Sequence, residues 1–282
     1  MKDSWMGTIY NMKKTIIFTD LDGTLIDHDT YRFDQVEATL KRLKEGAVPV
    51  IICSSKTRAE IETYRTSMGL DDPFIAENGG AIFVPQAIFD SKAEGFVKKG
   101  SYLVMELGKP YDVLRNAWTR MKAKEGFHMT GFSEMTIEQI VQHTSLPVAD
   151  ARLAAMREYS EPFLFFENHE RLRFLKKLLR EQGLQITKGG RFYHLTGNND
   201  KGKAVEILRK LYAQNHTGTS LFTIGLGDSA NDIPMLENVD LPVIIRKKTG
   251  RWEILKGNDS VMYSDKAGPK GWAESIDRIL KS

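Results

Sequence analysis

The sequence predicts an α/β protein, with a parallel-sheet core that carries helices on both faces and a second α/β unit inserted into it. Short apolar, β-branched runs such as residues 15–19 alternate with segments of helical spacing along the first 84 residues. The alternation stops near residue 85 and returns after residue 190. Such an alternation is typical of a Rossmann-like parallel sheet, whose ligand site lies at the carboxyl ends of the strands.

The elements of the core follow from periodicity and from helix signals. Val36, Leu40 and Leu43 have helical spacing, and Thr57 with Glu60 forms a predicted capping box at the start of the next helix. The expected strands are residues 15–19, 48–53, 74–76, 191–195, 221–225 and 241–245, and the expected helices are residues 36–46, 57–68, 201–212 and 231–238. We therefore expect a core domain at residues 12–84 and 191–282.

The middle of the chain has a different texture. Short strands at residues 102–107, 163–166 and 184–187 are interleaved with charged helices at residues 111–124 and 170–182. This pattern predicts an inserted α/β domain at residues 85–190. Residues 1–11 precede the first strand and are expected to be a flexible tail, or the result of a start codon assigned too far upstream; no function is expected of them in either case.

Composition excludes several classes of function. Forty Lys and Arg against 37 Asp and Glu give a net charge of only +3, which argues against a dedicated nucleic-acid-binding protein. No apolar stretch approaches the length needed to span a membrane, and no secretory signal precedes the first strand. The single cysteine, Cys53, cannot form an internal disulfide. A cytoplasmic protein without nucleic-acid or membrane partners is expected, and its oligomeric state is left open.

Two carboxylates end the first predicted strand. Asp20 and Asp22 are two residues apart, and Gly23 allows the backbone to turn sharply and to approach a ligand. This arrangement suits a hard cation together with a phosphate group. The alternative interpretation is a turn with solvated aspartates.

Three further polar groups follow the ends of predicted strands or open helices. Ser54 follows residues 48–53, although Ser55 competes for the same role, and Lys201 opens a helix with Lys203 as its rival. Two carboxylates in the sequence GDSAND, Asp228 and Asp232, follow the strand at residues 221–225 and lie one helical turn apart. Carboxylates are typical oxygen ligands of Mg²⁺. The same loop matches a relaxed dinucleotide-binding pattern, but Asp228 would place its charge where the pyrophosphate should bind.

Taken in chain order, DLDGTL, Ser54, Lys201 in DKGK and GDSAND resemble the four motifs of the haloacid-dehalogenase superfamily of phosphohydrolases. The long insertion between Ser54 and Lys201 is similar to the α/β cap of its sugar phosphatases. The segments SSKTRAEI, ENGGAIF, GGRFYHLTG and GDSANDIPML resemble the mannosyl-3-phosphoglycerate phosphatase family in particular.

The resemblance implies a role for each motif residue. Asp20 would be the nucleophile that forms an aspartyl-phosphate, and Asp22 would be the general acid and base. Ser54 would bind a phosphoryl oxygen, and Lys201 would neutralise the nucleophile and the transferring group.

The resemblance also implies Mg²⁺ as the cofactor. The ion would be held by Asp20, by the backbone carbonyl of Asp22 and by Asp228, with Asp232 supporting the metal site.

Substrate recognition must come from groups that face the part of the substrate that is released. Arg191 is the first choice for a carboxylate on that part, because a guanidinium binds a carboxylate through two hydrogen bonds. The other candidates lie beside Ser54 or after the third strand: Lys56, Arg58, Glu77, Asn78 and Gly79. For each of these positions, turn chemistry or an ordinary surface charge is an equal alternative. No two histidines have the spacing of a zinc site.

These expectations combine into one predicted function. It is a Mg²⁺-dependent phosphatase that acts on a small sugar phosphate, mannosyl-3-phosphoglycerate or its glucosyl counterpart, and produces a compatible solute. One alternative is another sugar phosphatase or a phosphomutase of the same superfamily. From a different class, the alternative is a metabolite-binding protein without catalysis on the same fold.

Overall fold

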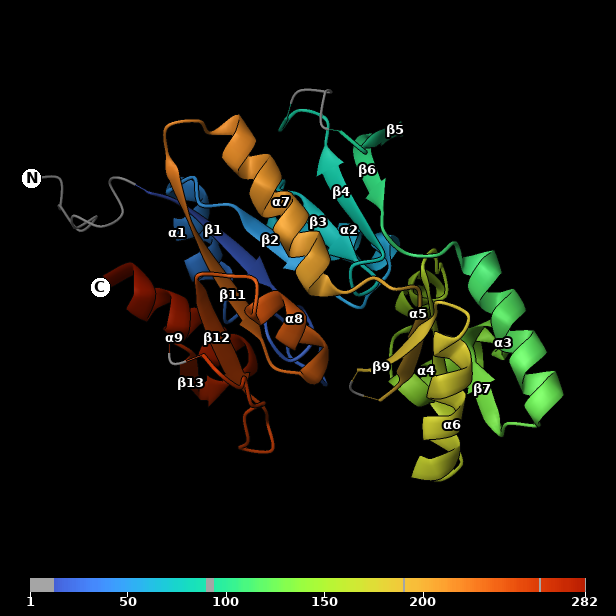
Figure 1. The fold of residues 1–282 in the computed structure, drawn as a ribbon. Coiled ribbons are helices and arrows are strands. Elements are labelled where there is room, and N and C mark those ends of the chain that lie inside the picture. The colour runs from blue at the N-terminus through green and yellow to red at the C-terminus, as the bar shows by residue number, and fades with distance from the viewer. Residues whose placement is uncertain (1–12, 90–93, 190, 259, 282) are drawn as a thin grey trace, which may run out of the picture.

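The computed structural model describes residues 13–89, 94–189, 191–258 and 260–281. Two sheets organise these residues, and Figure 1 shows the smaller sheet with its helices beside one end of the larger one. The tail predicted at residues 1–11 lies outside the described residues.

The larger sheet has nine strands in the order β13-β12-β11-β1-β2-β3-β4-β6-β5. Neighbours from β13 to β3 are parallel, and the pairs that involve β4, β5 and β6 are antiparallel. The strands are β1 (Lys13–Thr19), β2 (Val50–Cys53), β3 (Phe74–Ala76), β4 (Ala81–Pro85), β5 (Val97–Lys99), β6 (Tyr102–Glu106), β11 (Ser220–Gly227), β12 (Leu241–Arg246) and β13 (Met262–Ala267).

Helices cover both faces of this sheet, because successive side chains of a buried strand point to opposite sides. In β1, Ile17 packs in the cluster that contains Trp272, whereas Phe18 packs in the cluster that contains Leu208. One face carries α1 (Glu37–Glu45), α2 (Arg58–Met68) and α9 (Gly268–Lys281), and the other carries α7 (Lys201–Asn215) and α8 (Ile233–Leu236). The predicted fold class is confirmed. Among the described residues, no helix is long and apolar enough to cross a membrane.

The smaller sheet is antiparallel, with the order β7-β8-β10-β9. We call residues 107–200, which carry it, the cap unit. Its strands are β7 (Met129–Gly131), β8 (Ser160–Phe165), β9 (Gln185–Lys188) and β10 (Tyr193–Thr196), and its helices are α3 (Tyr111–Glu125), α4 (Ile137–Thr144), α5 (Val148–Ala154) and α6 (His169–Arg180). Buried residues of α3 and α6 form one apolar cluster with the sheet, and those of α4 and α5 form a second.

Two groups of strands belong to other sheets than the sequence predicted. β5 and β6 lie within the predicted insertion, yet they extend the larger sheet. β6 pairs with β4 in antiparallel register, from the pair of Ala81 with Glu106 to the pair of Pro85 with Tyr102. β10 was expected in the core, yet it lies between β8 and β9 in the smaller sheet. Composition does not show which strand pairs with which, and this explains both differences between the predicted and the observed pairing.

Candidate active site

The loop after β1 carries the first pair of predicted site residues. The amide of Asp20 donates to the carbonyl of Leu226 in β11 at 2.9 Å, so the backbone at Asp20 still follows the parallel ladder. Gly23 then turns the chain with a φ of 77°, and a Cβ at this position would lie 2.9 Å from Oδ2 of Asp228. Glycine therefore lets the loop after β1 approach the loop after β11.

Lys201 lies at the start of α7 and is completely buried. Its Nζ is 2.7 Å from Oδ1 of Asp20 and 2.6 Å from Oδ1 of Asp232. Burial alone would lower the pKa of Lys201, but the charges of Asp20 and Asp232 outweigh it and raise the pKa. The rival Lys203 is half exposed and bonds to the carbonyl of Asn198. The structure therefore brings Lys201, and not Lys203, to the aspartates.

The loop after β11 is organised by Asp232. Its Oδ2 accepts hydrogen bonds from the amides of Asp228 at 3.1 Å and Ser229 at 2.9 Å, while its Oδ1 binds Lys201. The side chain of Asp228 accepts a hydrogen bond from the hydroxyl of Ser229 at 2.7 Å. Both oxygens of Asp232 are thus engaged by the protein, and the second oxygen of Asp228 has no such partner among the described residues.

Three buried carboxylates converge at this point and could hold a metal ion. One oxygen each of Asp20, Asp228 and Asp232 lies within 4.8 Å of the others. Burial raises the pKa of Asp20 well above its usual value, and the charge of Asp232 adds to this rise. Burial and Asp232 likewise raise the pKa of Asp228 to about 7. One lysine does not balance three carboxylates, and a set of oxygen ligands fits a hard cation.

Ser54 lies at the carboxyl end of β2, next to β1 in the sheet. It is fully buried, its amide donates to the carbonyl of Ile75, and its hydroxyl accepts from the amide of Lys56 at 3.2 Å. The neighbouring Ser55 lines the cavity described next. Both serines therefore remain close to the site, and they differ in exposure to the cavity.

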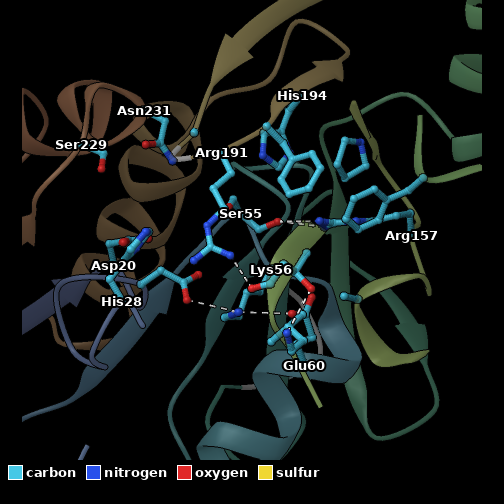
Figure 2. A pocket seen from close by; sticks show the side chains of 18 of the residues that line it. Asp20, His28, Ser55, Lys56, Glu60, Arg157, Arg191, His194, Ser229 and Asn231 are labelled. Atoms are coloured by element: carbon cyan, nitrogen blue, oxygen red, sulfur yellow. Dashed lines mark hydrogen bonds and ion pairs between the residues drawn. The ribbon is translucent and has the colours of Figure 1, made fainter. Parts of the chain in front are cut away.

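A cavity lies between Asp20 and the cap unit, as Figure 2 shows. The core contributes acidic and basic groups to its wall, and the cap unit contributes aromatic and basic groups. Its lining includes Asp20, Asp22, His28, Tyr31, Ser55, Lys56, Glu60, Phe132, Arg157, Arg191, Phe192, His194, Ser229 and Asn231.

Lys56 is a buried cation on the core side of this cavity. Its Nζ is 3.2 Å from Oδ1 of Asp22 and 3.3 Å from Oε1 of Glu60. The rings of Tyr31 and Tyr64 lie 5.2 and 5.7 Å from the same nitrogen. Burial opposes the charge, but Asp22 and Glu60 raise the pKa of Lys56. Lys56 is therefore charged and pairs with Asp22 and Glu60; Figure 2 shows it beside Glu60.

Arg191 enters the cavity from the cap unit, between Asp20 and Lys56 in the view of Figure 2. Its Nη1 donates to the backbone carbonyls of Thr144 and His143. No carboxylate pairs with Arg191 among the described residues, in contrast to Lys56 and Lys201. The site therefore holds one guanidinium whose charge is not balanced by a neighbouring acid.

Glu77 and Arg58 are not among the described residues that line the cavity, and their role in substrate binding stays a prediction. The carboxylate of Glu77 is fully buried and accepts from the amides of Glu158 and Tyr159 and from the hydroxyl of Ser160. Arg58 pairs with Glu158 at 3.0 Å. Both side chains join the core to the cap unit, because their partners come from the segment that leads into β8.

Asn78 and Gly79 also have structural partners. Oδ1 of Asn78 accepts from the side chain of Asn231 at 3.0 Å, and its carbonyl accepts from Asn199. A Cβ on Gly79 would lie 2.1 Å from the carbonyl oxygen of Asp200. These residues hold the loops after β3 and before α7 together, and their contact with a substrate stays a prediction.

Sequence reasoning missed two cavity residues of the cap unit. Arg157 is almost fully buried and donates to the carbonyl of Ser55 at 2.9 Å, and its Nε has no partner among the described residues. His194 is buried, and its Nδ1 likewise has no partner in the part of the chain that the structure describes. The segment GGRFYHLTG pointed to the region of His194, whereas nothing distinguishes Arg157 from the many other charged residues in the sequence.

Comparisons with known proteins agree with this geometry. A family model described as haloacid dehalogenase-like hydrolase matches residues 17–253. A glucosyl-3-phosphoglycerate/mannosyl-3-phosphoglycerate phosphatase from Methanococcoides burtonii is 43% identical over 267 residues, which cover 95% of this chain and 97% of that protein. A mannosyl-3-phosphoglycerate phosphatase from Pyrococcus furiosus is 38% identical over 230 residues, which cover 82% of this chain and 90% of that protein.

Solved structures share the fold at much lower identity. A protein from Thermoplasma acidophilum aligns with a TM-score of 0.67 and 17% identity, covering 96% of this chain and all of that one (100%). The sucrose-phosphatase from Synechocystis aligns with a TM-score of 0.61 and 16% identity, covering 95% and 98%. The fold and the family match place this chain in one class: it belongs to the haloacid dehalogenase-like hydrolases. Within that class, it is a phosphatase.

Proposed function

We propose that the chain removes phosphate from mannosyl-3-phosphoglycerate or glucosyl-3-phosphoglycerate in a reaction that depends on Mg²⁺. The observation that carries this proposal is that one cavity is lined by Asp20, which binds the buried Lys201, and by Arg191, which has no carboxylate partner among the described residues. The first pair suits phosphoryl transfer, and the arginine suits the carboxylate of a glycerate. The names of the relatives support the same substrates.

In the first step, an oxygen of Asp20 attacks phosphorus, the new O–P bond forms, and the bond from phosphorus to the glycerate oxygen breaks. Asp22, with a side chain that is about one-quarter exposed to the cavity, donates a proton to the leaving oxygen. In the second step, Asp22 takes a proton from water, the water oxygen attacks phosphorus, and Asp20 is released.

The remaining residues position and neutralise charge. Lys201 binds Asp20 and offsets the negative charge of the transferring group, and Ser54 binds a phosphoryl oxygen. Asp20, the carbonyl of Asp22 and Asp228 would hold Mg²⁺, and Asp232 orients the loop that carries Asp228. When bound, the ion stabilises the negative charge that builds up on the phosphoryl oxygens.

The cap unit supplies specificity in this proposal, and the core supplies chemistry. Lys56 faces Asp22 and is balanced by Glu60, which leaves Arg191 as the group for the carboxylate. We further propose a cytoplasmic setting, which the buried free thiol of Cys53 supports.

A substrate panel tests the proposal. Phosphate release should be fastest with mannosyl- and glucosyl-3-phosphoglycerate and much slower with hexose, trehalose and sucrose phosphates. Free phosphate should equal the glycosylglycerate formed, because a phosphomutase would return the phosphoryl group to a sugar. Preference for a substrate without a carboxylate would contradict the proposed substrate class.

Asp228→Ala should raise the Mg²⁺ concentration that gives half of full activity by roughly 10- to 100-fold, because one of few protein oxygens at the ion is lost. The measurement is phosphate release against Mg²⁺ concentration. Ser229→Ala is the matched control: it removes only a hydrogen bond to Asp228 and should shift the titration much less. An unchanged titration in Asp228→Ala would assign the ligand role to Asp232 instead.

Arg191→Ala should lower kcat/KM for mannosyl-3-phosphoglycerate by roughly one to two orders of magnitude, because hydrogen bonds to charged groups contribute about 1.5–3 kcal/mol each. Hydrolysis of p-nitrophenyl phosphate, which has no carboxylate, should change little. Arg191→Lys keeps the charge but loses the planar fork, so its effect should be intermediate. If activity fell equally with both substrates, Arg191 would have only a structural role in the cap unit, through its hydrogen bond to Thr144. Lys56 would then become the candidate that binds the carboxylate of the substrate.

A further inference from the structure

One face of the smaller sheet is directed at the core. In β10, Tyr193 and Leu195 pack in the cluster that contains α3 and α6, so His194 and Thr196 point to the opposite face. Ser160 lies opposite Thr196 in β8, and its hydroxyl donates to Glu77 of the core at 2.6 Å. The face that carries His194 is therefore the face toward the core and the cavity.

This face carries buried polar atoms that have no partner within the described part of the chain. His194 pairs in register with Pro162 of β8 and Thr187 of β9, so these three side chains form a row across the sheet. Nδ1 of His194 and Oγ1 of Thr187 are buried and have no hydrogen-bond partner among the residues that the structure describes. Proline offers no side-chain donor or acceptor. Most buried polar atoms in proteins have a hydrogen-bond partner. This row of side chains therefore indicates a bound ligand that supplies the missing partners.

The surroundings of His194 fit a neutral, hydroxyl-bearing ligand. Burial, and after it the charges of Arg157 and Lys201, lower the pKa of His194 to about 3, so the ring is neutral near pH 7. A neutral imidazole donates from one nitrogen and accepts at the other, as a hydroxyl group requires of its partner. Phe132 and Phe192 line the cavity beside it and provide an apolar surface for the C–H side of a sugar ring.

We propose that His194 binds a hydroxyl group of the glycosyl unit of the substrate, with Thr187 beside it. This inference rests on the proposed function and adds a residue that selects the glycosylated substrate over 3-phosphoglycerate alone. The phosphate lies at Asp20, the carboxylate binds Arg191, and the sugar then lies against β9 and β10 of the cap unit. His194 is a specificity residue here and takes no part in phosphoryl transfer.

His194→Leu tests the proposal, because it removes both ring nitrogens at similar volume. We expect kcat/KM for mannosyl- or glucosyl-3-phosphoglycerate to fall about tenfold, mainly through KM, the factor expected for a hydrogen bond to a buried polar group. The inhibition constant of 3-phosphoglycerate, which has the same phosphate and carboxylate but no sugar, should change less than about twofold. Tyr193→Phe, on the opposite face of the same strand, is the matched control and should leave both values unchanged.

Two further measurements keep the test decisive. The side chain of His194→Gln can still donate and accept a hydrogen bond, so this variant should keep most of the preference for the glycosylated substrate. It also tests the proposal if His194→Leu does not fold. An equal loss for both ligands, or no loss for the glycosylated one, would overturn the inference while the proposed function stands. No phosphate release from either glycosylated substrate by the wild type would overturn the proposed function, and this inference with it.

Discussion

Asp20→Asn should reduce phosphate release below about a hundredth of the wild-type rate while the protein stays folded. The amide has the same shape as the carboxylate and keeps the loop after β1, but it cannot attack phosphorus. Steady-state phosphate release with mannosyl-3-phosphoglycerate and saturating Mg²⁺ is the measurement, and thermal unfolding checks the fold.

The position of Asp20 explains why this effect should be so large. Asp20 follows β1 and belongs to the cluster of three carboxylates. Within this cluster it alone both contacts the buried Lys201 and lines the cavity where a substrate would bind. Asp228 and Asp232 belong to the loop after β11 and are absent from the lining of this cavity among the residues described. Residual activity well above a hundredth of wild type would show that another group attacks phosphorus.

Lys201→Met should destabilise the metal-free protein by about 3–5 kcal/mol, because removal of one partner leaves buried carboxylates uncompensated. Both ion-pair distances are short, and Lys201 and Asp232 have no exposed side-chain surface. Activity should fall by roughly two to three orders of magnitude, the usual cost of losing one group that stabilises developing charge. Urea unfolding in the presence of a chelator and phosphate release measure the two effects.

Two controls separate charge balance from packing. Lys203→Met changes an exposed lysine on the same helix and should alter the unfolding free energy by less than about 0.5 kcal/mol. Combining Lys201→Met with Asp232→Asn should recover part of the stability but none of the activity. Equal stability of Lys201→Met and wild type would contradict the charge balance described here.

The sequence predicted that Asp20 and Asp228 lie close together, because each of these residues follows the carboxyl end of a predicted strand. Asp20 and Asp228 directly follow apolar runs, and parallel strands bring their carboxyl ends to one edge of the sheet. The capping box of Thr57 and Glu60 is confirmed, because cap chemistry is local. Such local rules are readable without knowledge of the partners of each strand.

The features that the sequence did not reveal have a common physical origin in contacts between distant segments. Glu77 follows β3, as predicted, but its carboxylate binds the segment that begins β8, some eighty residues later in the chain. β10 has the apolar character of a core strand and pairs instead within the cap unit. His194 acquires its surroundings only from this pairing, so no sequence pattern distinguishes it from a satisfied core histidine.

Chemical trapping of the covalent intermediate tests the central claim most directly. Enzyme mixed with mannosyl-3-phosphoglycerate and Mg²⁺ is quenched within one turnover and treated with borohydride, which reduces an acyl phosphate on aspartate to homoserine. Peptide mass spectrometry should find homoserine at position 20 in the wild type, and none in the sample without substrate. Homoserine at another aspartate, or its absence from every peptide during a burst of product release, would contradict the assignment of Asp20 as the group that accepts the phosphoryl group.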